Sequence, residues 1–412
     1  MKMALDYINL SQETEKRITE DRKNGILNPY REKNEDAVRR NPSRDENTLV
    51  RPSYVRDIEK IMHIPYFNRY SDKTQVFSLY RNDDISRRIT HVQLVSRISR
   101  NIGSLLGLNT DLIEAIALGH DIGHTPFAHG GESILKEIHH ERSGRYFNHN
   151  VHSVRVLDRL ANRNISLQTL NGILCHNGEM ELSRYVPKKM ETFEELDETV
   201  EKCLDDEKEI ENLVPSTLEG CVVRISDIIA YLGKDRQDAI RLNLIEDEDI
   251  FTKMEIGNTN AEIINNITVN IVENSYGKNY LSMDDNYFRA LSKGKEENYE
   301  YIYRVAGVTG EYREVIKPMM EMMYDRFVKD IEENNRNSLI YNHHVKYLKE
   351  MNRYYEKYFI YEEEDARDIA ADYIASMTDD YFIDAFHFLF PESSLDLKFR
   401  GYFNRDRNYL EE

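Results

Sequence analysis

Two apolar stripes with helical spacing lead up to an adjacent His-Asp pair, and no other feature constrains the fold as much. The first stripe begins after His91, where apolar residues recur at steps of three and four, the spacing of one buried helix face. It consists of Val95, Ile98, Ile102 and Leu105. The second stripe consists of Ile113, Ile116 and Ala117. It leads to His120 and Asp121, and Gly123 with Pro126 is expected to end that helix. We therefore predict two helices that direct His91 inward and place the His-Asp pair at a helix end.

Two helix starts are predicted from capping-box spacing. Asp111 stands three residues before Glu114, and Ser216 stands three residues before Glu219. The helix predicted after Ser216 carries Asp227 in its apolar face, in four-residue register with Val223 and Tyr231. An acidic side chain in such a face is costly unless it is paired or bound to a metal. Asp227 is therefore a candidate functional residue.

The chain of 412 residues is predicted to be almost entirely helical, with an all-α fold. We expect an N-terminal arm over residues 1–50, a core over 51–241 and a C-terminal helical region over 242–412, packed on the core. Residues 186–213 are rich in Lys, Glu and Asp and are expected to form a solvated helical insertion. Because long Pro/Gly linkers are lacking, one continuous helical body is favoured over separable domains.

Composition narrows the class of protein. Hydrophobic residues make up 40% of the chain, enough for a substantial core, and the mean hydropathy is −0.67. No apolar run approaches the roughly 18–20 residues that span a bilayer, and the N-terminus has no hydrophobic signal core. A cytoplasmic protein without a membrane partner is expected. The net charge of −19 argues against a broad nucleic-acid-binding face. Cys175, Cys203 and Cys221 are expected to be reduced and structural.

The residues around the His-Asp pair suit a divalent metal. A neutral imidazole nitrogen beside a carboxylate oxygen makes half of a metal site. His91 and Asp227, both predicted to point inward, are the best candidates for the remaining ligands. Together they give the order His, His-Asp, Asp along the chain.

That order and its surroundings resemble the HD-domain superfamily of metal-dependent phosphohydrolases. More narrowly, the chain resembles the dGTPase-type deoxynucleoside triphosphate triphosphohydrolases. Seven blocks in the order of that family carry the resemblance, and they cover residues 51 to about 241, roughly half of the chain. The blocks are Arg56–His63, Phe67–Phe77, Arg88–His91, Glu114–Glu132, Phe147–Ser153, Gly172–Glu179 and Ser216–Tyr231. The resemblance implies an HD-domain helical bundle, extended here by the C-terminal helical region.

The resemblance also implies roles for individual residues. The positions that match the metal ligands of the family are His91, His120, Asp121 and Asp227, and the metal could be Mn, Mg, Fe, Ni or Zn. The positions that match further active-site residues are His124, His129, Glu132 and His149. For His129 and Glu132 the structural alternative is that they only cap the loop and the next helix.

Four positions match residues that contact substrate in the family. They are Gln75, Arg88, Tyr231 and Asp235. Arg88 matches a phosphate contact, with a surface salt bridge as its alternative. Gln75 and Asp235 match positions near the sugar hydroxyl. Tyr231 matches a ring that packs on deoxyribose, although core packing is a serious alternative in a chain with 27 tyrosines.

The expected activity is metal-dependent hydrolysis of dGTP or other deoxynucleoside triphosphates to a deoxynucleoside and tripolyphosphate. Two alternatives stay open: another HD-domain nucleotide phosphohydrolase or phosphodiesterase, and a catalytically silent nucleotide-binding regulator. The resemblance implies a homo-oligomer (dimer-based, tetramer or hexamer), and an allosteric nucleotide is a further candidate partner. Basic residues gather before the core, either as a solvated arm or as ligand contacts. They are Arg31, Lys33, Arg39, Arg40, Arg44, Arg51 and Arg56.

Overall fold

The computed structural model describes residues 5–176, 182–245, 250–304, 310–353 and 360–401, and it confirms the all-α class. Within these ranges, strand is limited to β1 (Arg184–Tyr185) and β2 (Leu281–Ser282), which pair antiparallel. Positions 177–179, at the end of the sixth family block, lie outside the described residues. No helix in the described ranges is both long and apolar enough to cross a membrane.

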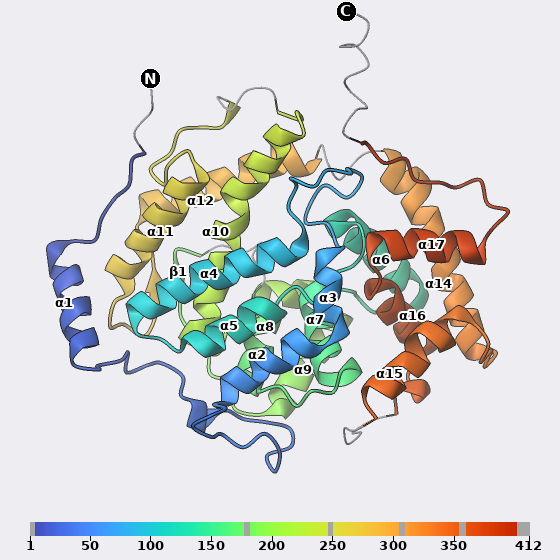
Figure 1. The fold of residues 1–412 in the computed structure, drawn as a ribbon, viewed down its shortest axis with the longest axis horizontal. Helices are drawn as coiled ribbons and strands as arrows, with labels where there is room; N and C mark the ends of the chain where they lie inside the picture. The colour runs from blue at the N-terminus through green and yellow to red at the C-terminus, as the bar shows by residue number, and fades with distance from the viewer. Residues whose placement is uncertain (1–4, 177–181, 246–249, 305–309, 354–359, 402–412) are drawn as a thin grey trace, which may run out of the picture.

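A first hydrophobic core holds the helices that the apolar stripes predicted (Figure 1). Its central helices are α2 (Ser53–His63), α4 (Arg88–Leu106), α5 (Thr110–Gly119), α8 (Leu167–Leu174) and α10 (Leu218–Arg241). Both stripes face this core, with Leu105 at its margin. The helix after His91 and the helix that ends at the His-Asp pair are thus confirmed.

Asp111 and Ser216, the N-cap residues predicted from capping-box spacing, are both wrong. The N-cap of α5 is Asn109, whose side chain accepts from the backbone N–H of Asp111 and of Leu112. The N-cap of α10 is Thr217, whose hydroxyl accepts from the Gly220 N–H at 3.1 Å. In each case a neighbouring side chain with an equivalent oxygen takes the cap position. Glu219 instead accepts the backbone N–H groups of Glu32 and Asn109, both at 3.0 Å, and so ties the N-terminal arm to the core.

The N-terminal arm runs along the first core (Figure 1) and contains α1 (Gln12–Lys23) and η1 (Asn34–Asp36). Two of its arginines form ion pairs with core side chains. Arg39 donates to the buried Asp57 at 2.7 Å, and Arg40 lies 2.8 Å from Asp158. Arg39 and Arg40 therefore hold the N-terminal arm against the core.

The charged insertion is helical, as predicted. It forms α9 (Phe193–Asp205) and η4 (Glu207–Asn212). Phe193, Leu196 and Cys203 are buried beneath its charged surface. Cys175, Cys203 and Cys221 are buried free thiols, in agreement with the expectation of reduced structural cysteines.

A second hydrophobic core joins α6 to the last helices of the chain, on the right of Figure 1. Its helices are α6 (Ala128–Ser143), η7 (Tyr312–Ile316), α14 (Lys317–Glu332), α16 (Ala366–Ala375) and α17 (Asp379–Leu389). By contrast, α11 (Asn260–Ser275) and α12 (Asp285–Asn298) pack on α10 and contribute to the first core. Residues beyond 242 are therefore shared between the two cores.

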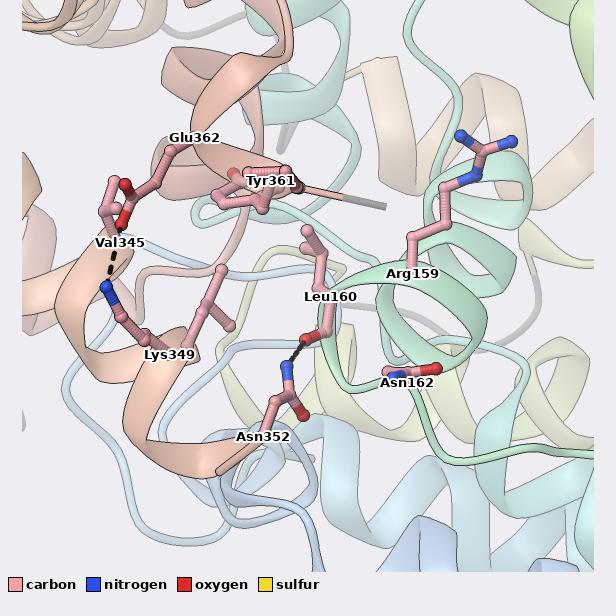
Figure 2. A pocket seen from close by; sticks show the side chains of 10 residues that line it. Arg159, Leu160, Asn162, Val345, Lys349, Asn352, Tyr361 and Glu362 are labelled. Atoms are coloured by element: carbon pink, nitrogen blue, oxygen red, sulfur yellow. Dashed lines mark hydrogen bonds and ion pairs between the residues drawn. The ribbon is translucent and has the colours of Figure 1, made fainter. Parts of the chain in front are cut away.

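The parts of the chain that form the two hydrophobic cores also meet at the end of α15 (Lys346–Met351), shown in Figure 2. The Asn352 amide donates to the Leu160 carbonyl at 2.6 Å, beside a small cavity of about 110 Å³. The remaining short elements connect the larger helices. They are α3 (Pro65–Asn68), η2 (Arg69–Ser71), α7 (His149–Arg155), η3 (Val156–Leu160), η6 (Tyr299–Tyr303), η8 (Tyr341–Val345) and η9 (Tyr361–Glu363).

Candidate metal centre and active site

The His-Asp pair stands where α5 ends. His120 is the C-cap residue and is fully buried. Its Nδ1 lies 2.7 Å from the Ala117 carbonyl, so Nδ1 carries the proton and Nε2 presents a lone pair. Nε2 is buried and has no hydrogen-bond partner among the described residues. An unpaired buried nitrogen is costly, and a metal ion would satisfy it.

Two helices bring further ligand atoms to the same point. His91 on α4 and Asp227 on α10 face each other, with His91 Nε2 2.9 Å from Asp227 Oδ1. That oxygen lies 3.8 Å from His120 Nε2. Burial opposes both charges, but the mutual hydrogen bond raises the pKa of His91 and lowers that of Asp227. These three side chains, from three helices of the first core, could hold a divalent metal.

Asp121 lies beside that trio and offers one free oxygen. Its Oδ2 accepts from Arg88, and its Oδ1 lies 3.6 Å from His120 Nε2. Burial opposes ionisation of Asp121, but Arg88 and the nearby histidines hold its pKa well below the usual range. The four predicted metal ligands are therefore together, and their N and O atoms suit the metals expected from the sequence.

The loop after Asp121 brings the predicted catalytic residues to the other side of that carboxylate. Gly123 approaches α7 so closely that a Cβ would lie 2.3 Å from the Ser153 backbone nitrogen. Farther along, Phe127 and Ala128 both have positive φ, 62° and 52°. Such left-handed backbone is strained for residues other than glycine. His124, before this turn, is buried, whereas the side chain of His129, after it, is 57% exposed.

Glu132 on α6 orders these histidines. It accepts from the His149 backbone N–H at 2.8 Å and from His149 Nδ1 at 2.9 Å. Its Oε2 lies 3.8 Å from His129 Nδ1 and 3.7 Å from His124 Nε2. Although burial opposes both charges, the pair lowers the pKa of Glu132 and raises that of His149 to about 9. Next to this group a cavity of about 390 Å³ opens, lined in part by His129, Glu132 and His149.

His176 also belongs to this site, although no role for it was expected from the sequence. Its Nε2 lies 3.2 Å from His149 Nε2 and 3.9 Å from Asp121 Oδ1. Its Nδ1 lies 2.6 Å from the Ile173 carbonyl. The arrangement repeats that of His120: each histidine follows an apolar helix and bonds the carbonyl three residues back. That repeat, inside the sixth family block, is the sequence signal that could have identified His176.

The predicted substrate contacts lie around the metal-ligand group. Arg88 is buried, not a surface residue, and besides Asp121 it donates to the Thr74 carbonyl at 3.3 Å. Gln75 is buried, and within the part of the chain that the structure describes its Oε1 has no hydrogen-bond partner. Tyr231 and Asp235 continue along α10 beyond Asp227. Asp235 accepts from the Tyr303 hydroxyl at 2.8 Å, a neighbour that local sequence patterns do not indicate. Burial raises the pKa of Asp235 to about 6.

Helices of the second core fix the backbone of the loop. Asp379, buried at the start of α17, accepts from the Phe127 N–H at 2.9 Å and from the Thr74 hydroxyl at 2.8 Å. The buried Lys73 ammonium donates to the His124 carbonyl and, at 2.8 Å, to the Ala375 carbonyl. The C-terminal helices therefore support the site, and their described residues contribute no atom to the groups that could hold a metal. The cavity of Figure 2 is lined by none of these residues.

Comparisons with known proteins identify the family of the chain. The HD domain family model matches residues 88–232. A "Deoxyguanosinetriphosphate triphosphohydrolase-like protein" from Caldanaerobacter subterraneus subsp. tengcongensis is 33% identical over 88% of this chain and 92% of its own length. A protein of the same description from Clostridium tetani is 30% identical over 81% and 84%. One from Desulfatibacillum aliphaticivorans is 31% identical over 69% and 75%. The chain therefore belongs to the deoxyguanosinetriphosphate triphosphohydrolase-like family of HD-domain proteins.

Proposed function

We propose that this protein hydrolyses deoxynucleoside triphosphates to a deoxynucleoside and tripolyphosphate. One observation carries the proposal: His91, His120, Asp121 and Asp227 converge beside the Glu132–His149 pair. Ligand atoms for a metal and groups for proton transfer thus share one site. Membership of an HD-domain hydrolase family supports the reaction class.

In this proposal a divalent metal is held by His91, His120, Asp121 and Asp227. The unpartnered His120 Nε2 and the mixed nitrogen and oxygen donors fit such an ion. When bound, it would polarise a phosphate oxygen and make a water molecule more acidic. Arg88, one helical turn before His91, adds positive charge next to the phosphates.

Proton transfer is assigned to His129 and Glu132, with His124 and His149 beside them. The carboxylate can set the tautomer of the imidazole and raise its basicity. A water oxygen attacks the α-phosphorus while the pair takes its proton. The bond from α-phosphorus to the sugar oxygen breaks, and the pair returns a proton to that oxygen. Water is thereby divided between the two products.

The sugar end is assigned to Gln75, Tyr231 and Asp235. The unpartnered Gln75 Oε1 and the Asp235 carboxylate can accept hydrogen bonds from a sugar hydroxyl. A Tyr231 ring against C2′ would leave no room for a 2′-hydroxyl, a steric way to reject ribonucleotides. We further propose that the protein acts in the cytoplasm as a homo-oligomer, with an allosteric nucleotide as a candidate regulator.

The bond that breaks can be identified by phosphorus NMR of a single turnover in oxygen-18 water. Each dNTP is tested with several metals. We expect tripolyphosphate that carries the label, together with unlabelled deoxynucleoside. Diphosphate plus dNMP would indicate another class of HD-domain phosphohydrolase, and the absence of turnover with every dNTP and metal would favour a silent regulator.

A further inference from the structure

A cavity of about 410 Å³ lies between α7, α9 and α16, and we call it the α16 cavity. No residue of the groups that could hold a metal lines it. Its volume falls within the roughly 300–1,000 Å³ of typical small-molecule sites. Its apolar walls consist of Phe147, Val151, Val154, Val200, Leu204 and Ala371. The chain therefore has room for a small molecule outside the site of the proposed function.

Three polar groups at the α16 cavity have hydrogen-bonding atoms that no described residue uses. They are Asn148 Nδ2, Arg145 Nε and Glu364 Oε1, and all three atoms are buried. The Asn148 residue is only 8% exposed, and its side chain forms no capping bond although it precedes α7. A buried polar group without a partner is costly. A ligand that accepts from the two donors and donates to the carboxylate would remove this cost.

The charge of the lining disfavours a phosphorylated ligand. Seven carboxylates and three arginines line the α16 cavity. Arg40 adds a fourth cation by pairing with two of the carboxylates, Asp158 and Asp197. Burial lowers the pKa of His139 to about 4, so this imidazole is neutral at pH 7. Negative charge is thus in excess among the described residues. A nucleotide would be repelled, because each phosphate monoester adds about −1.5 to −2 charges.

A polyamine and an uncharged polar molecule are the remaining classes of ligand. A polyamine would suit the carboxylates, but ammonium groups only donate and could not satisfy Asn148 Nδ2 or Arg145 Nε. A nucleoside has carbonyl oxygens and ring nitrogens that accept, and hydroxyl groups that donate. Its flat ring can also be covered by apolar side chains. The lining therefore favours an uncharged nucleoside.

Helix α7 connects the α16 cavity to the site of the proposed function. Asn148 lines both the α16 cavity and the cavity of about 390 Å³ beside His149. Within α7, His152 bonds the Gly123 carbonyl at 2.8 Å and Asp372 at 3.2 Å. Gly123 belongs to the loop after the His-Asp pair, and Asp372 lines the α16 cavity. A ligand between α7 and α16 would therefore act on the position of His149 and of that loop.

We propose that the α16 cavity binds an uncharged nucleoside and that the bound nucleoside slows turnover through α7. The cavity and its ligand class are argued from the lining alone. Only the effect on turnover rests on the proposed function. The deoxynucleoside that the proposed reaction would release belongs to this class, so a product would limit its own formation without occupying the metal centre.

The test compares nucleoside binding in two variants of α9. Val200→Trp fills the α16 cavity, whereas Glu198→Trp places the same side chain at an exposed position of the helix. Equilibrium dialysis of the full-length chain against each radiolabelled deoxynucleoside counts the bound ligand. For at least one of the four, the count at saturation should fall by one per chain in Val200→Trp and stay unchanged in Glu198→Trp. Binding at the metal centre cancels in this comparison. With dAMP, the unaltered protein and both variants should bind equal amounts.

Equal deoxynucleoside counts in the unaltered protein and Val200→Trp would overturn the proposal, and so would a loss of dAMP binding in that variant. If Val200→Trp fails to fold by circular dichroism, a crystal structure of the unaltered protein with saturating deoxynucleoside decides. An empty α16 cavity in that crystal would refute nucleoside binding.

Steady-state kinetics with dNTP test the effect on turnover. Added deoxynucleoside should lower kcat of the unaltered protein and of Glu198→Trp, but not of Val200→Trp. A purely competitive effect, seen as a raised KM in all three proteins, would refute the regulatory role. Binding in the α16 cavity by a protein that hydrolyses no dNTP would refute the proposed function alone.

Discussion

The two ends of the histidine cluster are built in different ways. The buried end (His91, His120 and Asp227) projects from α4, α5 and α10, all helices of the first core. The open end consists of His124, His129, Glu132 and His149. Its residues lie on a loop or in the first turns of α6 and α7, next to a cavity of about 390 Å³.

The buried end is built to hold an ion in a fixed position, whereas the open end is accessible from the cavity. Side chains on packed helices are positioned more precisely than those on loops, as a fixed ion requires. The open end has a strained turn at Phe127 and Ala128 and an exposed His129, and it borders the cavity of about 390 Å³. If this division is right, changes at the buried end should abolish metal binding, whereas changes at the open end should alter rate and selectivity.

The largest effect is expected from His120→Ala at the buried end. Bound metal and activity should both be lost, because the unpartnered Nε2 is removed. Helix content should persist, because His120 is the C-cap of α5 and not one of its interior residues. Elemental analysis, circular dichroism and product chromatography measure the three quantities. Full activity in a metal-free variant would abolish the distinction between the two ends.

At the open end, His129→Ala should lower kcat by about 10²–10⁴, the usual contribution of a general acid or base. The metal of the buried end should be retained, and the fold should be unaffected, since the side chain is 57% exposed. Steady-state kinetics and metal analysis of the same preparation check both points. Unchanged turnover would indicate that His129 only caps the loop and the next helix.

Asp379→Ala tests whether α17, which lies outside the site, holds the loop of the open end in place. It removes the acceptor of the Phe127 N–H and the Thr74 hydroxyl. Small misplacement of catalytic groups can lower kcat by about 10²-fold, and we expect a loss of that order with bound metal unchanged. The adjacent, exposed Asp380→Ala is the control. Equal kcat in both variants would show that the loop holds its shape without the second core.

Selectivity should change in Tyr231→Ala. Without the ring, the preference for dGTP over GTP, measured as the ratio of kcat/KM values, should fall about 10-fold or more. Bound metal should not change. Tyr299→Ala, at a side chain that is 63% exposed, is the matched control. An unchanged preference would favour core packing as the role of Tyr231.

The smallest effect concerns pH. Burial raises the pKa of Asp235 to about 6, so its carboxyl is protonated below that pH and ionised above it. If the carboxylate accepts a sugar hydroxyl, KM for dNTP should fall about 10-fold as pH rises from 5 to 7. Asp235→Asn should remove this dependence. A variant with the same pH profile would show that another group titrates.

Local patterns predicted the helices that carry His91 and Asp227 and the inward direction of both side chains. The stripe after His91 and the four-residue register of Asp227 both follow from helix geometry, which depends only on neighbours in the chain. Cap residues were misassigned because several adjacent side chains could serve as caps, and the sequence does not rank them. Asn109 and Thr217 hold those places in the structure.

The supports of the open end could not be predicted in this way. Phe127 and Asp379 are bonded across 252 positions of sequence, and the partners of Lys73 lie 51 and 302 positions away. No local periodicity encodes such pairs. His176 is intermediate: its relation to Ile173 is local, but its approach to His149 appears only when α7 and α8 are packed.

The bonds from Asp379 and Lys73 bear on how this family domain could be shortened or transplanted. The segment matched by the HD domain model ends at residue 232, before Ala375 and Asp379. Cut at that boundary, the segment would expose the apolar side of α6 and leave the turn at Phe127 without its acceptor. The shortest functional version of this protein should therefore extend through α17. A smaller scaffold should be sought by deletions elsewhere in the chain.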